Sequence, residues 1–522
     1  MICLPKSAED MGKTQREISV SEFFEKNKHL LGFDNPTKAL LIIVKEAVDN
    51  SLDACEEAGI LPEITVNITQ KDDDIYRIKI KDNGPGIVKK QVPYVFGKLL
   101  YGSKFHTNKQ NRGQQGIGIS ACLLYSQLTT GKETIVKTKT KDQEKTHSFH
   151  LLIDTEKNEP KIVKEEELDR GITDHGISIN MEAVANYRRT QGVEQYLRQT
   201  AIANPFAKIT YKTPEGEKIT YNRAVDKLPK PSKKIKPHPH GVELGILMRM
   251  AETTGSRTIG TFLRNDFSST GKTSAEKICN LAKVDPKMSI DEMGRKEAEK
   301  LIKAMQRVNL QSPPLDCLSP IGENALKERL ENMFSDANFI ETVTRRPAVY
   351  RGNPFQIEVG LVYDPENLDK DKKSKLMRFA NRVPLLYQKG ACAIYKAASE
   401  TTWKRYGLKQ NNKSLPIGPV IIVLHISSVW VPFISESKEA IASYPDIVKE
   451  MSLALQSCGR KLKTHLNKRK KAKKEKKRLH IFEDYFPLIE KAAKSLAEEK
   501  GKVDIKPVME KVVKKDLVKE DE

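Results

Sequence analysis

The sequence lacks the features that would hold it together with disulfides or zinc, or place it in a membrane. Its seven cysteines, at positions 3, 55, 122, 279, 317, 392 and 458, are scattered and form no Cys-x-x-Cys pair. This spacing argues against a disulfide framework or a zinc site and indicates a reducing compartment. Residues 1–15 contain no apolar segment followed by a cleavage site, so we expect no signal peptide. The most apolar run, residues 420–434, includes His425 and Pro432 and is too short to cross a bilayer.

Negative charge is also in the minority. The 522 residues, enough for three or four domains, include 90 Lys and Arg against 69 Asp and Glu, a formal net charge of +21. Such an excess favours a polyanionic partner, and residues 460–478 concentrate it, with twelve basic residues and one acid, Glu475. This run should attract the phosphates of duplex DNA without reading their sequence. We therefore expect a cytoplasmic, nucleoid-associated protein with no membrane partner.

Three polar segments within 75 residues of one another carry the strongest functional signal. Glu46, Asn50 and Asp53 stand at i, i+4 and i+7, so they share one face of a helix whose other positions are apolar. The second segment is Asp82-Asn83-Gly84-Pro85-Gly86, and the third is Gly113-Gln114-Gln115-Gly116-Ile117-Gly118. Each has an ordinary explanation: a solvated helix face, a hairpin turn and a flexible loop. Together and in this order, they favour a site that holds a metal–nucleotide complex and activates a water molecule.

The three segments resemble the N box, the Asp-x-Gly-x-Gly adenine loop and the glycine-rich lid of the GHKL ATPases, which have the Bergerat α/β fold. The resemblance implies ATP and Mg²⁺ as ligands, with Glu46 orienting and deprotonating the attacking water, Asn50 binding Mg²⁺ and Asp82 accepting a hydrogen bond from adenine. One amide oxygen suffices for Mg²⁺ when phosphates and water complete its shell. Glycines allow close approach of the backbone and leave N–H groups free for phosphate. Further expected nucleotide contacts are Asp53, Gly84, Gly86, Ser103, Lys104, Arg112, Gly113, Gln114, Gln115, Gly116, Ile117, Gly118 and Ile119.

Longer segments narrow the resemblance. Ser21-Glu22-Phe23-Phe24, Tyr101-Gly102-Ser103-Lys104-Phe105 and the run from Arg112 to Ile119 are similar to the B subunits of type IIB DNA topoisomerases, the topoisomerase VI family. The similarity runs from about residue 15 to about residue 485. One departure is Gly176-Ile177-Ser178, where many relatives place a Gly-Thr pair behind the adenine. A Gly-Lys-Thr at residues 271–273 ends like a P-loop, but it lacks the first glycine and the preceding strand.

Composition and resemblance together predict four parts in an α/β chain. These are an N-terminal strap with the GHKL ATPase domain (1–228), a helix-two-turn-helix domain after a proline- and lysine-rich linker (229–310), a β–α–β transducer domain with a long C-terminal helix (311–485), and a partly mobile C-terminal extension (486–522). Within them we expect a helix over 289–308, a half-buried strand over 356–363, a helix over 391–405, a buried strand over 420–426, and a last helix from Pro445 to about residue 478.

The loop after the apolar strand ends at Lys438. The resemblance implies that this lysine reaches the γ-phosphate, whereas an ordinary surface lysine is the simpler explanation. The implied function is that of the ATP-binding and hydrolysing subunit of a topoisomerase. ATP would drive self-dimerisation and gate the passage of duplex DNA and the relaxation of supercoils, while a separate DNA-cleaving A subunit would break the strands.

Three other functions have to be weighed. A sensor histidine kinase shares the nucleotide fold, but none of the ten histidines precedes Glu or Asp as a phosphoacceptor would. A non-enzymatic DNA clamp would have no need of Glu46. A mismatch-repair-type GHKL ATPase clamp is the nearest enzyme alternative, and it differs from a topoisomerase in whether ATP use depends on crossed or supercoiled DNA.

Overall fold

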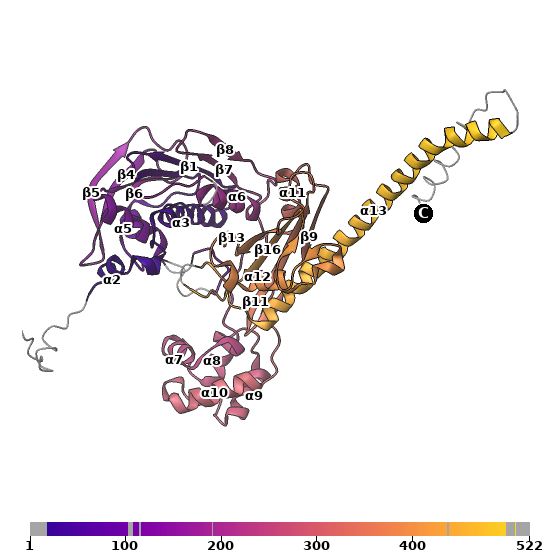
Figure 1. The fold of residues 1–522 in the computed structure, drawn as a ribbon. Helices are drawn as coiled ribbons and strands as arrows, with labels where there is room; N and C mark the ends of the chain where they lie inside the picture. Colours follow the sequence, from indigo (N-terminus) through magenta and orange to yellow (C-terminus); the bar gives the residue numbers. More distant parts are fainter. Residues whose placement is uncertain are drawn as a thin grey trace, which may run out of the picture. The chain divides into compact units, whose positions relative to one another are not determined.

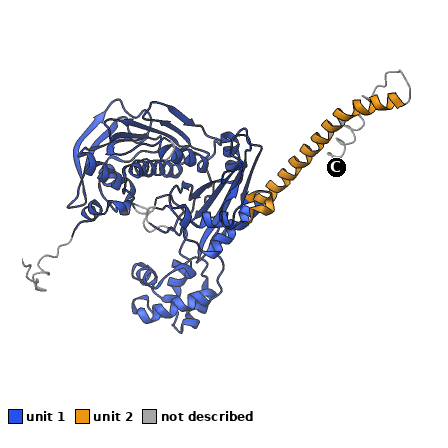
Figure 2. Cartoon of the chain, in the orientation of Figure 1, with its two compact units in different colours: residues 1–401, 410–458 blue, residues 402–409, 459–522 orange. Residues whose placement is uncertain are grey.

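The computed structural model describes residues 18–102, 108–113, 116–189, 192–435, 438–496 and 507. The chain divides into two compact units (Figure 2), residues 1–401 with 410–458, and residues 402–409 with 459–522. The first unit contains both large sheets, and the second contains a short 3-10 helix and the distal part of the last helix.

An eight-stranded mixed sheet forms the first part of the larger unit (Figure 1), with the strand order β5-β4-β3-β6-β2-β1-β7-β8. Its strands are β1 (Glu63–Gln70), β2 (Ile75–Lys81), β3 (Thr134–Lys139), β4 (Thr146–Asp154), β5 (Glu159–Leu168), β6 (Gly176–Val184), β7 (Lys208–Lys212) and β8 (Lys218–Tyr221). Neighbours are antiparallel except β1 and β7. Along β2, Tyr76, Ile78 and Ile80 are buried and alternate with exposed residues, as expected when helices cover one face.

Helices on that face are α3 (Pro36–Glu57), α5 (Gly118–Thr130) and α6 (Val193–Ala203), with α2 (Val20–Lys26), α4 (Val92–Gly97) and the 3-10 helices η1 (Lys28–Leu31) and η2 (Lys89–Gln91) beside them. The start of α3 is fixed by Asn35, whose side chain accepts a hydrogen bond from the Lys38 amide at 2.8 Å. The apolar stripe of α3 is buried from Leu40 to Leu52, so its polar stripe faces away from the sheet.

A cluster of short helices follows the linker: η3 (Pro239–Gly241), α7 (Leu244–Thr253), α8 (Ile259–Asp266), α9 (Lys272–Ala282), η4 (Ile290–Glu292) and α10 (Arg295–Arg307). They enclose a core of their own, which includes Leu247, Phe262 and Leu301. The single helix expected over 289–308 is wrong: Gly294 has an extended backbone and caps α10, so the chain before it forms only the 3-10 turn.

A second sheet has the order β10-β11-β16-β12-β13, with β9 also paired to β11. Its strands are β9 (Phe339–Thr344), β10 (Ala348–Tyr350), β11 (Asn353–Tyr363), β12 (Lys375–Ala380), β13 (Val383–Pro384) and β16 (Val420–Ser428). This part of the chain also contains α11 (Glu323–Met333), η5 (Lys389–Ala391), α12 (Ala393–Glu400) and a separate two-stranded sheet of β14 (Lys409–Gln410) and β15 (Pro416–Ile417). The parallel pair joined through α12 is β12 and β16. The strand β11, which the pattern predicts as the first strand of the β–α–β unit, lies antiparallel to β16.

Two expectations in this region are wrong. The strand β11 is buried continuously from Ile357 to Val362, not on alternate residues, because it lies inside the sheet and Leu330 of α11 packs on Gly360. The helix expected over 391–405 ends at Glu400, and a separate 3-10 helix, η6 (Trp403–Tyr406), follows it. Extended backbone at Thr401 interrupts the helical path between them.

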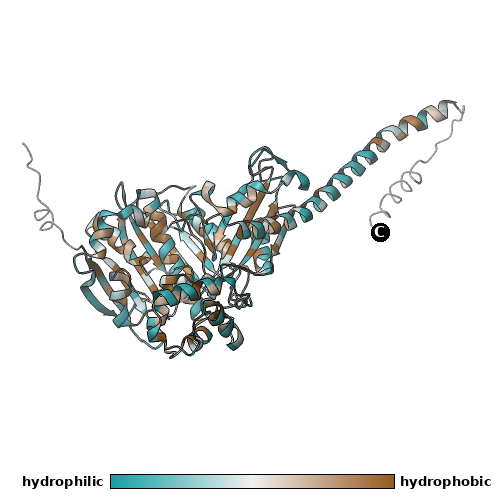
Figure 3. Cartoon of the chain, turned by 90° about the horizontal axis from the view of Figure 1, so that it is seen from below, coloured by the Kyte–Doolittle hydropathy of each residue, from teal (hydrophilic) through white to brown (hydrophobic). Residues whose placement is uncertain are grey.

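The last helix, α13 (Pro445–Leu496), begins at the expected proline and runs 52 residues, past the predicted end at 478. Within the first unit its apolar stripe, from Ile447 to Cys458, is buried. Within the second unit, Gly459 lies against Tyr406. The basic stretch that follows is mostly exposed and hydrophilic (Figure 3). Among the described residues, none of the helices has the length and hydropathy needed to cross a membrane.

Candidate functional site

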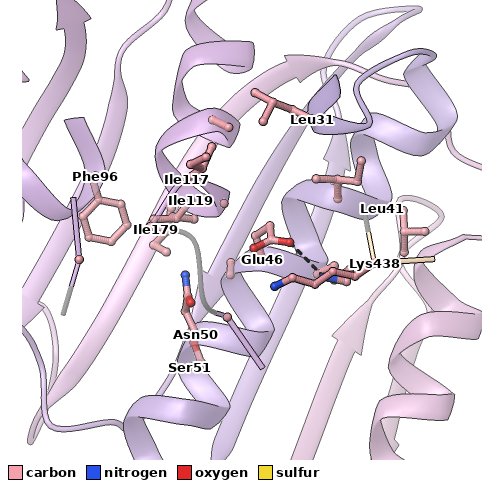
Figure 4. Close-up of a pocket in the computed structure, with 18 of the residues that line it drawn as sticks. Leu31, Leu41, Glu46, Asn50, Ser51, Phe96, Ile117, Ile119, Ile179 and Lys438 are labelled. Carbon is pink, nitrogen blue, oxygen red and sulfur yellow. Dashed lines mark hydrogen bonds and ion pairs between the residues drawn. The ribbon is translucent and has the colours of Figure 1, made fainter. Parts of the chain in front are cut away.

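A cavity of about 1590 Å³ lies beside the polar face of α3. The loop after β2, the start of α5, the segment after β13 and the loop after β16 also contribute to its walls. Segments more than 300 residues apart in sequence therefore meet at one site, as Figure 4 shows for Glu46 and Lys438. The residues lining it that the sequence predicted are Glu46, Asn50, Asp82, Gly84, Gly86, Gly113, Gly116, Ile117, Gly118, Ile119 and Lys438.

Glu46 is held in its ionised form. Its Oε1 accepts a hydrogen bond from Lys45 Nζ at 3.0 Å, and Lys45 also pairs with Asp49 at 3.3 Å. Burial acts to raise the pKa of Glu46, but the positive charges of Lys45 and Lys438 outweigh it, and the net pKa lies below its usual value of 4.5. A carboxylate at this position can accept a hydrogen bond from water at any physiological pH.

Two glycines, Gly118 and Gly113, lie close to the side chains of Glu46 and Asn50. A Cβ on Gly118 would lie 1.9 Å from Glu46 Oε2, so only glycine permits this approach at the start of α5. A Cβ on Gly113 would lie 3.8 Å from Asn50 Oδ1, which places the asparagine oxygen beside the loop. The amino end of α5 thus opens into the cavity next to Glu46, where backbone N–H groups favour an anion.

Asp82 also lines the cavity, beside Ser51 of α3. Its Oδ1 accepts hydrogen bonds from the amides of Gly84 (2.9 Å) and Ile177 (3.1 Å), and its Oδ2 accepts one from Ser51 Oγ at 2.6 Å. Burial raises its pKa, while these three donors act in the opposite direction. At Gly176, the first residue of the Gly176-Ile177-Ser178 segment, a Cβ would meet the Asp82 carbonyl at 2.2 Å. The backbone behind Asp82 is therefore packed too closely for a side chain at this glycine.

Lys438 comes from the loop after β16 and enters the same cavity. Its Nζ donates a hydrogen bond to the Arg112 carbonyl at 3.1 Å, and its backbone has a φ of 53°. Burial lowers its pKa, although the nearby Glu46 acts to raise it. The adjacent Glu439 pairs with Lys38 of α3 at 2.8 Å, which ties this loop to the N-terminal half of the site.

Two predicted contacts have a different environment. Asp53 and Arg112 do not line the cavity but pair with each other at 2.7 Å, in a buried cluster that also contains Glu56 and Arg382. Ser103, Lys104, Gln114 and Gln115 lie outside the described residues.

Sequence reasoning missed other contributors. Lys45 follows no motif, and neighbouring residues on a helix do not usually face each other, so its pairing with Glu46 gave no signal. Ser51 could have been noticed as the residue after Asn50, but its partner Asp82 is 31 residues away in sequence. The segment 384–388, which also lines the cavity, follows from β13 of the second sheet and carries no recognisable pattern.

The fold and the site define an ATPase of the GHKL class. Residues 35–157 match the family described as the histidine kinase-, DNA gyrase B- and HSP90-like ATPases. Residues 313–478 match a second family, the transducer of the topoisomerase VI B subunit. The chain therefore combines a nucleotide-binding ATPase head with a transducer.

Similar whole proteins identify the family. The chain is 48% identical to the B subunit of type 2 DNA topoisomerase 6 from Methanosarcina barkeri, over 97% of this chain and 81% of that protein. It is 47% identical to the protein of the same name from Archaeoglobus fulgidus, over 94% and 81% of the two chains. The counterpart from Methanothermobacter thermautotrophicus is 38% identical, over 92% of each. The chain belongs to the topoisomerase VI B subunit family and is the ATP-driven subunit of a type II DNA topoisomerase, which favours the main prediction over the repair-type alternative.

Proposed function

We propose that this chain is an ATP-gated clamp, in which ATP bound in the cavity brings two copies together and directs DNA passage through a separate cleaving subunit. The observation that carries the proposal is the meeting of Glu46, from the ATPase helix, with Lys438, from the loop after the transducer strand β16, in one cavity. A site built from both domains can make hydrolysis depend on their relative arrangement.

The proposed nucleotide contacts form two groups, one for adenine and one for the phosphates. Asp82 would accept a hydrogen bond from the adenine amino group, and Gly84 and Gly86 would let the backbone approach the base. Gly113, Gly116, Gly118, Ile117 and Ile119 would surround the phosphates at the amino end of α5. Asp53 and Arg112 would hold the loop at Gly113 in place from outside the cavity, because their side chains pair with each other. Ser103, Lys104, Gln114 and Gln115 complete the proposed set from the sequence.

The metal and the reaction involve the polar face of α3. Asn50 would hold Mg²⁺ through its amide oxygen; the side chain lines the cavity and is exposed. When bound, Mg²⁺ neutralises phosphate charge. Glu46 would accept a hydrogen bond from the attacking water and so orient that water. Lys438 would place its positive charge beside the position of the γ-phosphate. Phosphoryl transfer needs little covalent help from a protein, so positioning and charge account for the catalysis.

The remaining parts of the chain would bind duplex DNA and the DNA-cleaving A subunit. We propose the four-part division at residues 1–228, 229–310, 311–485 and 486–522, with the helical cluster and the exposed basic stretch of α13 as contacts for duplex DNA. The partner is the A subunit, which supplies strand cleavage. Binding to DNA implies a nucleoid-associated location.

Three measurements on the purified chain test the proposal. The chain should dimerise with a non-hydrolysable ATP analogue and Mg²⁺, bind duplex DNA with a steep salt dependence, and leave supercoiled plasmid uncut. Addition of the A subunit should give relaxation only when ATP is present. Covalent protein–DNA adducts formed by this chain alone would contradict the division of labour, and nucleotide-independent dimerisation would contradict the gating.

A further inference from the structure

A buried ion-pair cluster lies next to the nucleotide cavity. Glu56, in the last turn of α3, uses both carboxylate oxygens: Oε1 accepts from Arg112 Nη2, and Oε2 accepts from Arg382 Nη2 at 2.6 Å. Arg112 pairs in addition with Asp53 at 2.7 Å. The side chains of Arg112 and Arg382 are only 2% and 6% exposed. Two arginines of different domains therefore share one carboxylate of the ATPase helix.

Arg382 is held in an unusual backbone conformation. It follows Asn381 in the two-residue turn between β12 and β13, and both residues have positive φ angles, 47° and 66°. Such a turn favours Asn-Gly, so an arginine at its second position is unfavourable in itself. Strain of this kind is kept where the surroundings fix it and often has a functional reason. Here the turn points Arg382 at Glu56.

The same turn contacts the loop that receives Lys438. Asn381 Nδ2 donates to the Asn111 carbonyl at 3.2 Å, and the next residue, Arg112, offers its carbonyl to Lys438 Nζ. Asn111, Arg112, Asn381 and Lys438 also line one small pocket beside these hydrogen bonds. The hydrogen-bond acceptor for Lys438 is thus held from the transducer side through Asn381 and Arg382.

The turn is also tied to the strand that leads to Lys438. The Arg382 amide donates to His425 Nε2 at 2.9 Å, which requires a neutral imidazole with its proton on Nδ1. That nitrogen donates a hydrogen bond to Glu358 Oε2 at 2.8 Å. The Glu358 carboxylate also accepts hydrogen bonds from the backbone amides of Ile321 and Gly322, which precede α11. His425 belongs to β16, whose following loop carries Lys438. Arg382 therefore bonds directly to the strand that precedes Lys438, and it is linked through Glu56 to Arg112, whose carbonyl accepts from Lys438.

We propose that Arg382 is a positioning residue for Lys438, acting through the shared carboxylate of Glu56 on Arg112 and so linking the transducer sheet to the lysine in the nucleotide cavity. This rests on the proposed role of Lys438 at the γ-phosphate. A purely structural cluster would also satisfy these buried charges, but it would not make the effects of Arg382 and Lys438 on hydrolysis depend on each other.

A double-mutant cycle on the full chain separates these explanations. ATPase kcat and KM, and the binding of a non-hydrolysable ATP analogue, are measured for wild type, R382Q, K438A and the double variant. We expect R382Q to lower kcat by at least about fivefold, about 1 kcal/mol, with analogue affinity changed less than about twofold. The double variant should be no slower than K438A alone. Reductions that multiply in the double variant, or a normal kcat in R382Q, would overturn the inference.

Two further variants keep the outcome decisive. R329Q is the matched control, because Arg329 is also buried and donates to a backbone carbonyl, that of Pro205 at 3.1 Å, without touching the cluster. Its effect, if any, should multiply with that of K438A. If R382Q does not fold, the cycle is run with R382K, which keeps the positive charge beside Glu56 and should give the same non-additivity with a smaller loss. A normal kcat in K438A would instead refute the proposed role of Lys438, which distinguishes failure of that role from failure of the inference.

Discussion

Replacement of Glu46 by glutamine tests the centre of the proposed mechanism. Glutamine keeps the shape that packs against Gly118, but it cannot take a proton from water. A positioned general base contributes about 10²–10⁴-fold, so kcat should fall by that factor, equivalent to about 2.7–5.4 kcal/mol of barrier. Lys45 retains Asp49 at 3.3 Å, so the free energy of unfolding should fall by no more than about 1.5–3 kcal/mol.

Nucleotide affinity should survive this change, because the contacts proposed for adenine and phosphate lie elsewhere and one negative charge has left the phosphate end. Single-turnover hydrolysis at saturating ATP and equilibrium binding of an ATP analogue measure the two effects separately. E182Q is the control, since Glu182 of β6 is a buried carboxylate that pairs with Arg77 at 2.6 Å and does not line the cavity. Hydrolysis by E46Q within about threefold of wild type would refute the assignment of the base.

The other predictions concern recognition, signalling and space in the same cavity. D82N should weaken ATP binding by about 1.5–3 kcal/mol, as titration with the analogue would show. K438A should bind ATP almost normally yet hydrolyse it slowly and lose DNA strand transport; equal losses of affinity in K438A and D82N would contradict the signalling role. G118A should abolish hydrolysis, because the new Cβ would lie 1.9 Å from Glu46 Oε2, and normal turnover would show that the helix start differs in the active state. Because the pKa of Glu46 is lowered, its carboxylate stays ionised below the usual value of 4.5. The pH profile of kcat should therefore show no loss from Glu46 between pH 6 and 8. A fall in kcat toward acid pH that is present in wild type and absent in E46Q would contradict this.

Much of the first domain could be predicted from the sequence, because local pattern and tertiary burial agree there. The period-two pattern of residues 76–80 matches β2, and the apolar stripe with its polar face matches α3. In the second sheet, the pattern was misleading at β11, where alternating polar residues such as Glu358 are buried with dedicated partners. Whether a strand has one or two covered faces depends on what packs there, and the strand's own sequence does not specify it.

The sequence by itself determined the family and the central residues of the cavity, since Glu46, Asn50, Asp82 and the glycine loops form a motif with fixed spacing. Only the tertiary structure decided the charges around them. Asp53 follows the helical spacing of the motif, but it pairs with Arg112 in a buried cluster, and the pKa of Glu46 depends on Lys45 and Lys438. Electrostatic energies depend on distance and burial, which the fold sets between residues hundreds of positions apart.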